Sequence, residues 1–141
     1  MRKTIAPLLV LAILALFTPS LFAADPVEGE WLKDDQSARI KLKVTRKGEL
    51  MGVISYVKDP KRTHDTNNPD ASKHKRKLLG LVIIRGFSKE GDKWGGGTVY
   101  DSKTGKTYKG KIWLEQGKLM MRGYVGVSLI GKTASWTKYG K

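Results

Sequence analysis

The segment from Lys58 to Lys77 concentrates polar side chains of the kinds that bind ligands. Its centre, Asp65-Thr-Asn-Asn-Pro-Asp70, is rich in the oxygen atoms that calcium prefers. An EF-hand alignment fails, because Asp70 stands where glycine is needed and Arg76 stands where glutamate is needed. Asn-Pro-Asp is typical of a turn whose side chains bond nearby backbone amides. We expect a turn that either holds this loop in place or contacts a ligand, and no metal site.

Both histidines of the chain, His64 and His74, flank this turn. Neither has a second metal ligand at a fixed spacing or a serine in a recognisable nucleophile motif. The chain has no cysteine, which excludes disulfides, thiolate metal sites and a cysteine nucleophile. Clustered cations attract phosphates of any kind, so the loop is either simply solvated or a contact for an anionic group. The basic residues around the histidines are Lys61, Arg62, Lys73, Lys75, Arg76 and Lys77.

A second motif, Gly126 to Thr133, matches the phosphate-loop pattern G-x-x-x-x-G-K-[ST]. That loop binds phosphate only where it opens a helix within a βαβ unit. Only eight residues follow Thr133, and their pattern is that of a strand. We interpret the match as accidental and expect no nucleotide.

The start of the chain predicts export. Arg2 and Lys3 precede an apolar run from Ile5 to Phe17, and small residues follow up to Ala24. The run is shorter than the roughly 18 to 20 residues that span a bilayer. We therefore expect residues 1–24 to be a cleaved signal peptide, residues 25–141 to form one domain in the periplasm, and no transmembrane segment to remain. The chain has 27 Lys and Arg against 13 Asp and Glu, a positive charge that by itself would suit nucleic acid. Because the chain is expected to be exported, we do not expect nucleic acid as its partner.

The rest of the chain predicts short strands. The clearest alternation places Ala38, Ile40, Leu42 and Val44 on one face, and no ten-residue window has helical periodicity. Short turns between successive strands favour a closed eight-stranded antiparallel up-and-down barrel over a sandwich. The expected strands cover residues 27–33, 38–45, 50–57, 79–84, 94–101, 107–114, 119–125 and 132–139. Glycines are expected where a small barrel bends, at Gly52, Gly80, Gly97, Gly110 and Gly123.

Tryptophans fall on the first and the last expected strand, at Trp31 and Trp136. These two strands are neighbours in a closed barrel. Lys138 is then placed to cover a tryptophan face through a cation–π contact of about 1 kcal/mol and to close one end of the barrel.

Short motifs follow one another along the whole domain. They are Gly29-x-Trp31, Asp65-x-x-Asn68-Pro69-Asp70, Arg76 with Leu78 and Gly80, Trp94-x-Gly96-Gly97-x-Val99-Tyr100-Asp101, Gly105-Lys106-x-Tyr108, Leu119-x-x-Arg122-Gly123 and Trp136-Thr137. Taken together and in this order, they resemble the bacterial family catalogued as domain of unknown function 2147. The resemblance covers essentially the whole domain and implies a small exported protein with a lipocalin-like β-barrel, without an established biochemical activity.

From this fold we expect a non-enzymatic protein, without a cofactor, that holds a small apolar or amphipathic ligand in the barrel mouth. The basic loop suits an anionic headgroup. A second reading has the aromatic residues filling the barrel, Arg76 pairing with Asp65 or Asp70, and the basic exterior docking on anionic lipid, lipopolysaccharide or an acidic partner. The candidate ligand contacts are Asp65, Asn68, Arg76, Trp94, Tyr100, Tyr108 and Arg122.

Overall fold

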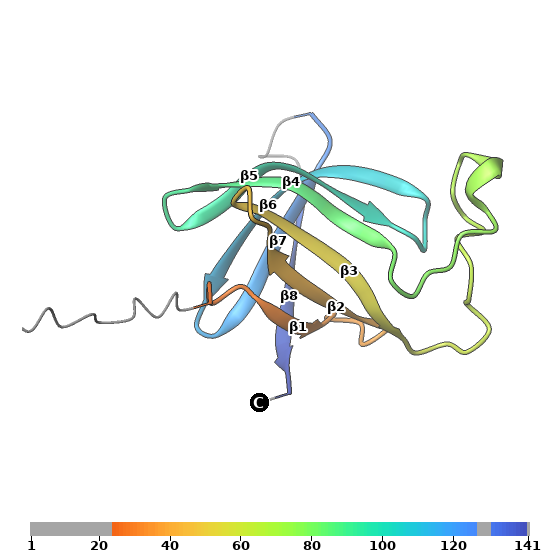
Figure 1. The fold of residues 1–141 in the computed structure, drawn as a ribbon, viewed down its shortest axis with the longest axis horizontal. Helices are drawn as coiled ribbons and strands as arrows, with labels where there is room; N and C mark the ends of the chain where they lie inside the picture. The colour runs from red at the N-terminus through yellow and green to blue at the C-terminus, as the bar shows by residue number, and fades with distance from the viewer. Residues whose placement is uncertain (1–23, 127–130, 141) are drawn as a thin grey trace, which may run out of the picture.

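The computed structural model describes residues 24–126 and 131–140 (Figure 1). The signal peptide predicted for residues 1–24 lies almost wholly outside this part of the chain. Eight strands and one short 3-10 helix make up the described fold: β1 (Gly29–Leu32), β2 (Ala38–Val44), β3 (Glu49–Val57), η1 (Ala71–Lys73), β4 (Val82–Glu90), β5 (Lys93–Asp101), β6 (Lys106–Glu115), β7 (Lys118–Tyr124) and β8 (Gly131–Tyr139).

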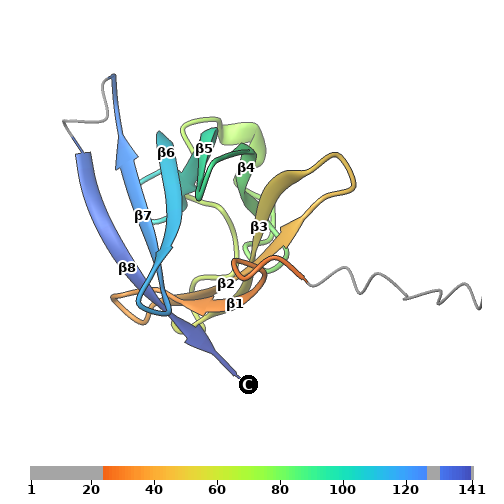
Figure 2. The ribbon, with the colours of Figure 1, turned by 90° about the vertical axis from the view of Figure 1, so that its left-hand side faces the viewer.

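Each strand pairs antiparallel with the next, and β1 pairs with β8 to close the sheet. Figure 2 shows the strands following one another around the ring. The predicted up-and-down barrel is therefore confirmed. Because successive strands reverse direction, the connections β1–β2, β3–β4, β5–β6 and β7–β8 share one end, which we call the open end. The connections β2–β3, β4–β5 and β6–β7 share the other, which we call the closed end.

Alternation along the strands separates core from surface. In β2, Ile40 and Leu42 are each 1% exposed, whereas Lys41 and Lys43 between them face solvent. Such a pattern is stable as a strand because one face enters the barrel and the other remains hydrated. The lysine-rich composition of the chain is therefore compatible with an apolar interior.

Strand β4 begins and ends later than the sequence pattern predicts. The apolar run from residue 79 suggested a strand over 79–84, but Leu79 is 61% exposed and Gly80 has φ of +82°, a turn conformation that favours glycine. Leu78 before this turn is fully buried. The strand proper runs from Val82 to Glu90, so its charged second half belongs to the sheet.

The interior is filled at the closed end by Leu50, Phe87, Ile112 and Leu119, all 0% exposed. A Cβ atom at Gly97 would overlap the ring of Phe87 and lie 2.6 Å from the Arg85 carbonyl oxygen. Gly110 and Gly52 similarly lie against core side chains, so these strand glycines leave room for the core. Gly80, in contrast, lies in a turn and not in a strand.

The long connection between β3 and β4 extends from the open end and contains η1 (Figure 1). At the same end, Gly131, Lys132 and Thr133 begin strand β8 and do not open a helix, which argues against phosphate-loop chemistry at this motif. No helix in the described part of the chain has the length and apolar character needed to cross a membrane.

Candidate functional site

A cavity of about 660 Å³ occupies the open half of the barrel. It reaches inward to Ile40, Met121 and Trp136, which come from β2, β7 and β8. Ala38 and Ala134 line the cavity, and their small side chains leave space that larger residues at these positions would fill. The interior surface is largely apolar and suits the hydrocarbon part of a ligand.

The rim of this cavity is polar and carries more positive than negative charge. Its lining includes four cations, Lys33, Arg62, Lys103 and Lys132, against the two carboxylates of Asp34 and Asp101. Two of the cations are also held by the protein. Lys103 Nζ lies 2.9 Å from Asp35 Oδ2, and Arg62 Nη2 donates to the Ser102 carbonyl at 3.1 Å. The rim thus places positive groups, two of them held by neighbouring residues, beside an apolar interior.

The long β3–β4 connection is fastened by a buried carboxylate. Asp65 is 0% exposed and accepts hydrogen bonds from Tyr100 Oη at 2.5 Å, Arg76 Nη2 at 2.7 Å and Asn68 Nδ2 at 2.9 Å. Its own backbone N–H donates to the Arg76 carbonyl at 2.9 Å. Residues distant in sequence are therefore joined through one side chain.

Protonation of Asp65 is opposed by its partners. Burial acts to raise the pKa of the carboxyl group, but the hydrogen bonds from Tyr100, Arg76 and Asn68 outweigh burial and hold this pKa below its ordinary value. Burial, together with the hydrogen bond to Asp65, raises the pKa of Tyr100 to about 12. At neutral pH the network consists of an ionised Asp65, a protonated Tyr100 and a positive Arg76.

The Asn-Pro-Asp turn forms for local reasons that the sequence indicates. Asp70 N–H donates to Asn68 Oδ1 at 2.9 Å, and Asp70 then caps η1 through its side chain. The turn contacts the β5–β6 connection, where Asn67 Nδ2 donates to the Lys103 carbonyl at 3.0 Å. Gly105, with φ of +73°, is required there because a Cβ atom would overlap the Asn67 carbonyl oxygen.

The structure brings together some of the predicted ligand contacts and separates others. Tyr100 and Tyr108 line the barrel cavity. Asn68, Arg76 and Tyr100 line a smaller cleft outside the barrel, and Asp65 is enclosed beneath them. The sequence leaves open whether Arg76 pairs with Asp65 or with Asp70. In the structure Arg76 pairs with Asp65, with 2.7 Å between Nη2 and Oδ2.

Trp94 and Arg122 lie away from the cavity. Trp94 is 3% exposed in the closed-end core, where Lys89 Nζ lies 5.2 Å from its ring centroid. Arg122 alternates with the inward-facing Met121, so it is on the outer face of β7, and its Nη1 donates to Thr133 Oγ1 at 3.1 Å. Neither side chain is among the residues that surround the cavity.

The tryptophans of the first and last strands occupy neighbouring positions. Trp31 pairs with Lys138 across β1 and β8, and Lys138 Nζ lies 4.7 Å from the Trp31 ring centroid. Lys138 also donates to the Glu28 carbonyl at 2.5 Å. Trp136 instead lines the cavity, so the two tryptophans serve different parts of the barrel.

The sequence prediction did not include the rim cations Lys33, Lys103 and Lys132 among its candidates. Their common signal is positional, because each lies in or beside a connection that follows an odd-numbered strand. In an up-and-down barrel all such connections share one end. Charges near these connections can therefore be assigned to the open end once the strand order is known.

Comparison with solved structures supports the same fold. Protein HP1028 from Helicobacter pylori, described as belonging to the lipocalin family, matches with a TM-score of 0.73 at 18% sequence identity, over 84% of this chain and 85% of that chain. At this identity the likeness concerns the fold. No curated protein matches the sequence.

A family model provides the assignment at the level of sequence. The model for bacterial proteins described as "Uncharacterized protein conserved in bacteria (DUF2147)" matches residues 29–138, which covers β1 to β7 and all of β8 except its last residue. Its match and the lipocalin-like fold agree with the resemblance carried by the tryptophan, Asn-Pro-Asp and glycine motifs. The chain therefore belongs to the uncharacterized bacterial family DUF2147.

Proposed function

We propose that this protein binds a small amphipathic molecule in its barrel, with the apolar part inside and an anionic group at the rim. The observation that carries the proposal is the cavity of about 660 Å³, which has an apolar interior and four cations in its lining. Its volume falls within the range of about 300–1,000 Å³ that is usual for small-molecule sites. The lipocalin-like fold supports a ligand in this position.

The proposed role is binding without catalysis, in the periplasm. The buried carboxylate of Asp65 is engaged by Tyr100, Arg76 and Asn68, which suits a loop anchor. The predicted signal peptide of residues 1–24 supports export. N-terminal sequencing of protein recovered from the periplasm tests this location, and a chain retained in the cytoplasm with an intact start would contradict it.

The binding proposal is tested with two fluorescent probes, a polyunsaturated fatty acid and a neutral naphthylamine. Ala134→Trp places a large ring in the cavity wall, whereas Ser135→Trp places the same ring on the alternate, outward position of β8. We expect at least a tenfold loss of affinity for both probes in the first variant and little change in the second.

The charge at the rim is tested separately. Lys33→Gln combined with Lys132→Gln is expected to weaken the fatty-acid probe several-fold and to leave the neutral probe unchanged. Failure of the unmodified protein to bind either probe, or equal loss in the Ala134 and Ser135 variants, would overturn the proposal. Thermal unfolding of each variant checks that the barrel is intact.

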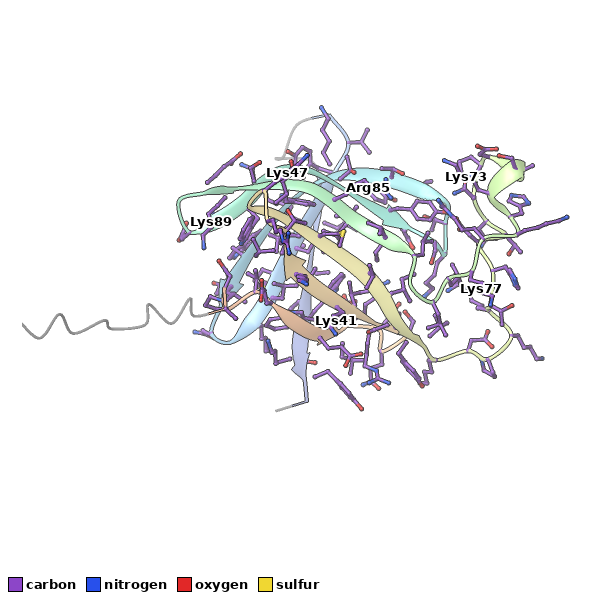
Figure 3. All side chains as sticks on the ribbon, viewed as in Figure 1. Lys41, Lys47, Lys73, Lys77, Arg85 and Lys89 are labelled. Atoms are coloured by element: carbon purple, nitrogen blue, oxygen red, sulfur yellow. The ribbon has the colours of Figure 1, made fainter. Side chains whose placement is uncertain are left out.

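The alternative of docking through the basic exterior has its own observable. Exposed cations on β2, the β2–β3 turn and β4 spread over one face, as the labels of Lys41, Lys47 and Arg85 in Figure 3 show. Association of this face with anionic vesicles should weaken strongly when salt is raised, because the Debye length falls from about 10 Å at 0.1 M to about 3 Å at 1 M. Salt-independent uptake of the neutral probe instead favours the cavity.

A further inference from the structure

A second hollow, the outer cleft, lies outside the barrel between the long β3–β4 connection and the outer faces of β4, β5 and β6. Its volume is about 360 Å³. Part of the Asn-Pro-Asp turn forms one wall, and outward-facing Thr98 and Thr107 belong to the opposite wall. Tyr100 borders both this cleft and the barrel cavity. The ligand proposed for the barrel does not account for the outer cleft.

The outer cleft is lined by three cations and one carboxylate. The cations are Lys73 from η1, Arg76 from the same connection and Arg85 from β4, and the carboxylate is Asp70. Oδ1 of Asp70 already accepts from the Ser72 amide at 3.0 Å and the Ser72 hydroxyl at 2.6 Å. Figure 3 shows Lys73 on the long connection and Arg85 on the sheet.

The three cations differ in how they are held. Arg76 is paired with the fully buried Asp65, yet its side chain remains 35% exposed and lines the outer cleft. Among residues 24–126 and 131–140, neither Lys73 nor Arg85 takes part in an ion pair, although Arg85 Nη2 donates to the Val82 carbonyl at 3.1 Å. With the Arg76–Asp65 pair set aside, Lys73 and Arg85 outnumber the single carboxylate of Asp70, so the cleft lining keeps a net positive charge.

Asp65 holds the guanidinium of Arg76 in place beside the outer cleft. The same carboxylate that holds Arg76 also accepts from Tyr100 and Asn68, and all three of these residues line the outer cleft. Buried partners that fix a charged side chain lower the cost of ordering it when a ligand binds. A loop anchor explains the contacts of Asp65, but it does not require Lys73 and Arg85 to line the same hollow.

We propose that the outer cleft binds a phosphate monoester, with Lys73, Arg76 and Arg85 around the phosphate and the threonine hydroxyls beside the attached polar group. A guanidinium presents planar donors that match phosphate oxygens, and lysine adds a mobile charge. The volume exceeds that of a bare phosphate ion and leaves space for a small polar substituent. Such a phosphate can belong to a free metabolite or to a lipid headgroup.

The test uses titration of the isotope-labelled protein with glycerol 3-phosphate, with glycerol as the uncharged comparison, followed by amide chemical shifts. We expect saturable shifts around Asn68, Thr98 and Thr107 with glycerol 3-phosphate alone. Lys73→Gln combined with Arg85→Gln should weaken binding at least tenfold. The matched control, Lys47→Gln combined with Lys75→Gln, removes the same charge from the β2–β3 turn and from the loop outside the outer cleft and should retain binding.

A second arm measures association with vesicles that contain phosphatidic acid. Vesicle binding that depends on Lys73 and Arg85 assigns the site to a lipid headgroup, and binding of free glycerol 3-phosphate alone assigns it to a soluble ligand. Equal weakening in the two double variants, or absence of binding in both arms, would overturn the proposal. Unchanged thermal unfolding in the variants establishes that lost binding is not lost folding. Because the barrel probes report on a different cavity, failure here leaves the proposed barrel ligand to be judged separately.

Discussion

The two ends of the barrel use the same alternating strands for different purposes. At the closed end, Phe87 and its neighbours fill the interior over glycines, and Leu50, Phe87, Ile112 and Leu119 are 0% exposed. At the open end, Ala38 and Ala134 line a cavity of about 660 Å³. Side-chain size at inward positions, and not strand pattern, distinguishes the two ends. Stability should therefore depend mainly on the closed end, and binding mainly on the open end.

The largest expected effect is the loss of a closed-end side chain. Phe87→Ala removes a ring that is completely buried against Gly97 and Gly110, so we expect a loss of about 3–5 kcal/mol in the free energy of unfolding. Met121→Ala, beside the open-end cavity, should cost less, about 2 kcal/mol, because its surroundings are already partly unfilled. Urea unfolding of both variants measures the difference. Equal losses would contradict the proposed division between the two ends.

A smaller effect is expected where the long connection is fastened to the open end. Asp65→Asn removes the charge that accepts from Arg76 and Tyr100, and we expect a loss on the order of 2–3 kcal/mol at neutral pH, as for hydrogen bonds that involve charged groups. The pKa of Asp65 is lower in the folded state than in the unfolded state, where it is about 4. The contribution of Asp65 to stability is therefore fully present above the unfolded-state pKa and is lost as the pH falls through the folded-state pKa.

Unfolding at pH 7 and in steps down to pH 3 measures this linkage. The stability difference between the wild type and Asp65→Asn should shrink as the pH falls. Asp34→Asn, a change at an exposed position in the β1–β2 turn, is the control and should show little loss at pH 7. A difference that stays constant with pH would mean that the charge of Asp65 does not stabilise the loop.

Much of the barrel follows from the sequence because its information is local. Ile40 and Leu42 alternate with lysines, and short turns join all successive strands except β3 and β4, so most of the sheet can be derived without long-range contacts. The start of β4 could not be derived in this way. Leu78 is buried and its neighbour Leu79 is exposed, because the chain turns at Gly80. That turn depends on the backbone conformation of Gly80, which the apolar pattern does not indicate.

The sites were less predictable than the fold. Tyr100 and Asp65 are 35 positions apart, and their hydrogen bond exists only because β5 passes beside the loop. The cavity itself depends on which inward side chains from different strands meet around one hollow, as Ala38 of β2 and Ala134 of β8 do. Motif composition pointed to Arg76 and Asn68, but it could not distinguish the barrel interior from the outer cleft.

The smallest effects come from single methyl groups, and they separate the two ends most directly. Gly97→Ala should destabilise the protein by about 1–2 kcal/mol, because the new Cβ meets the Phe87 ring and the Arg85 carbonyl. Gly123→Ala should be neutral or stabilising by about 0.5 kcal/mol, since its Cβ would lie 3.5 Å from Tyr108 Cβ, an ordinary contact, and alanine restricts the unfolded chain. Parallel thermal and urea unfolding compares them, and similar losses in both would show that the open end is as tightly packed as the closed end.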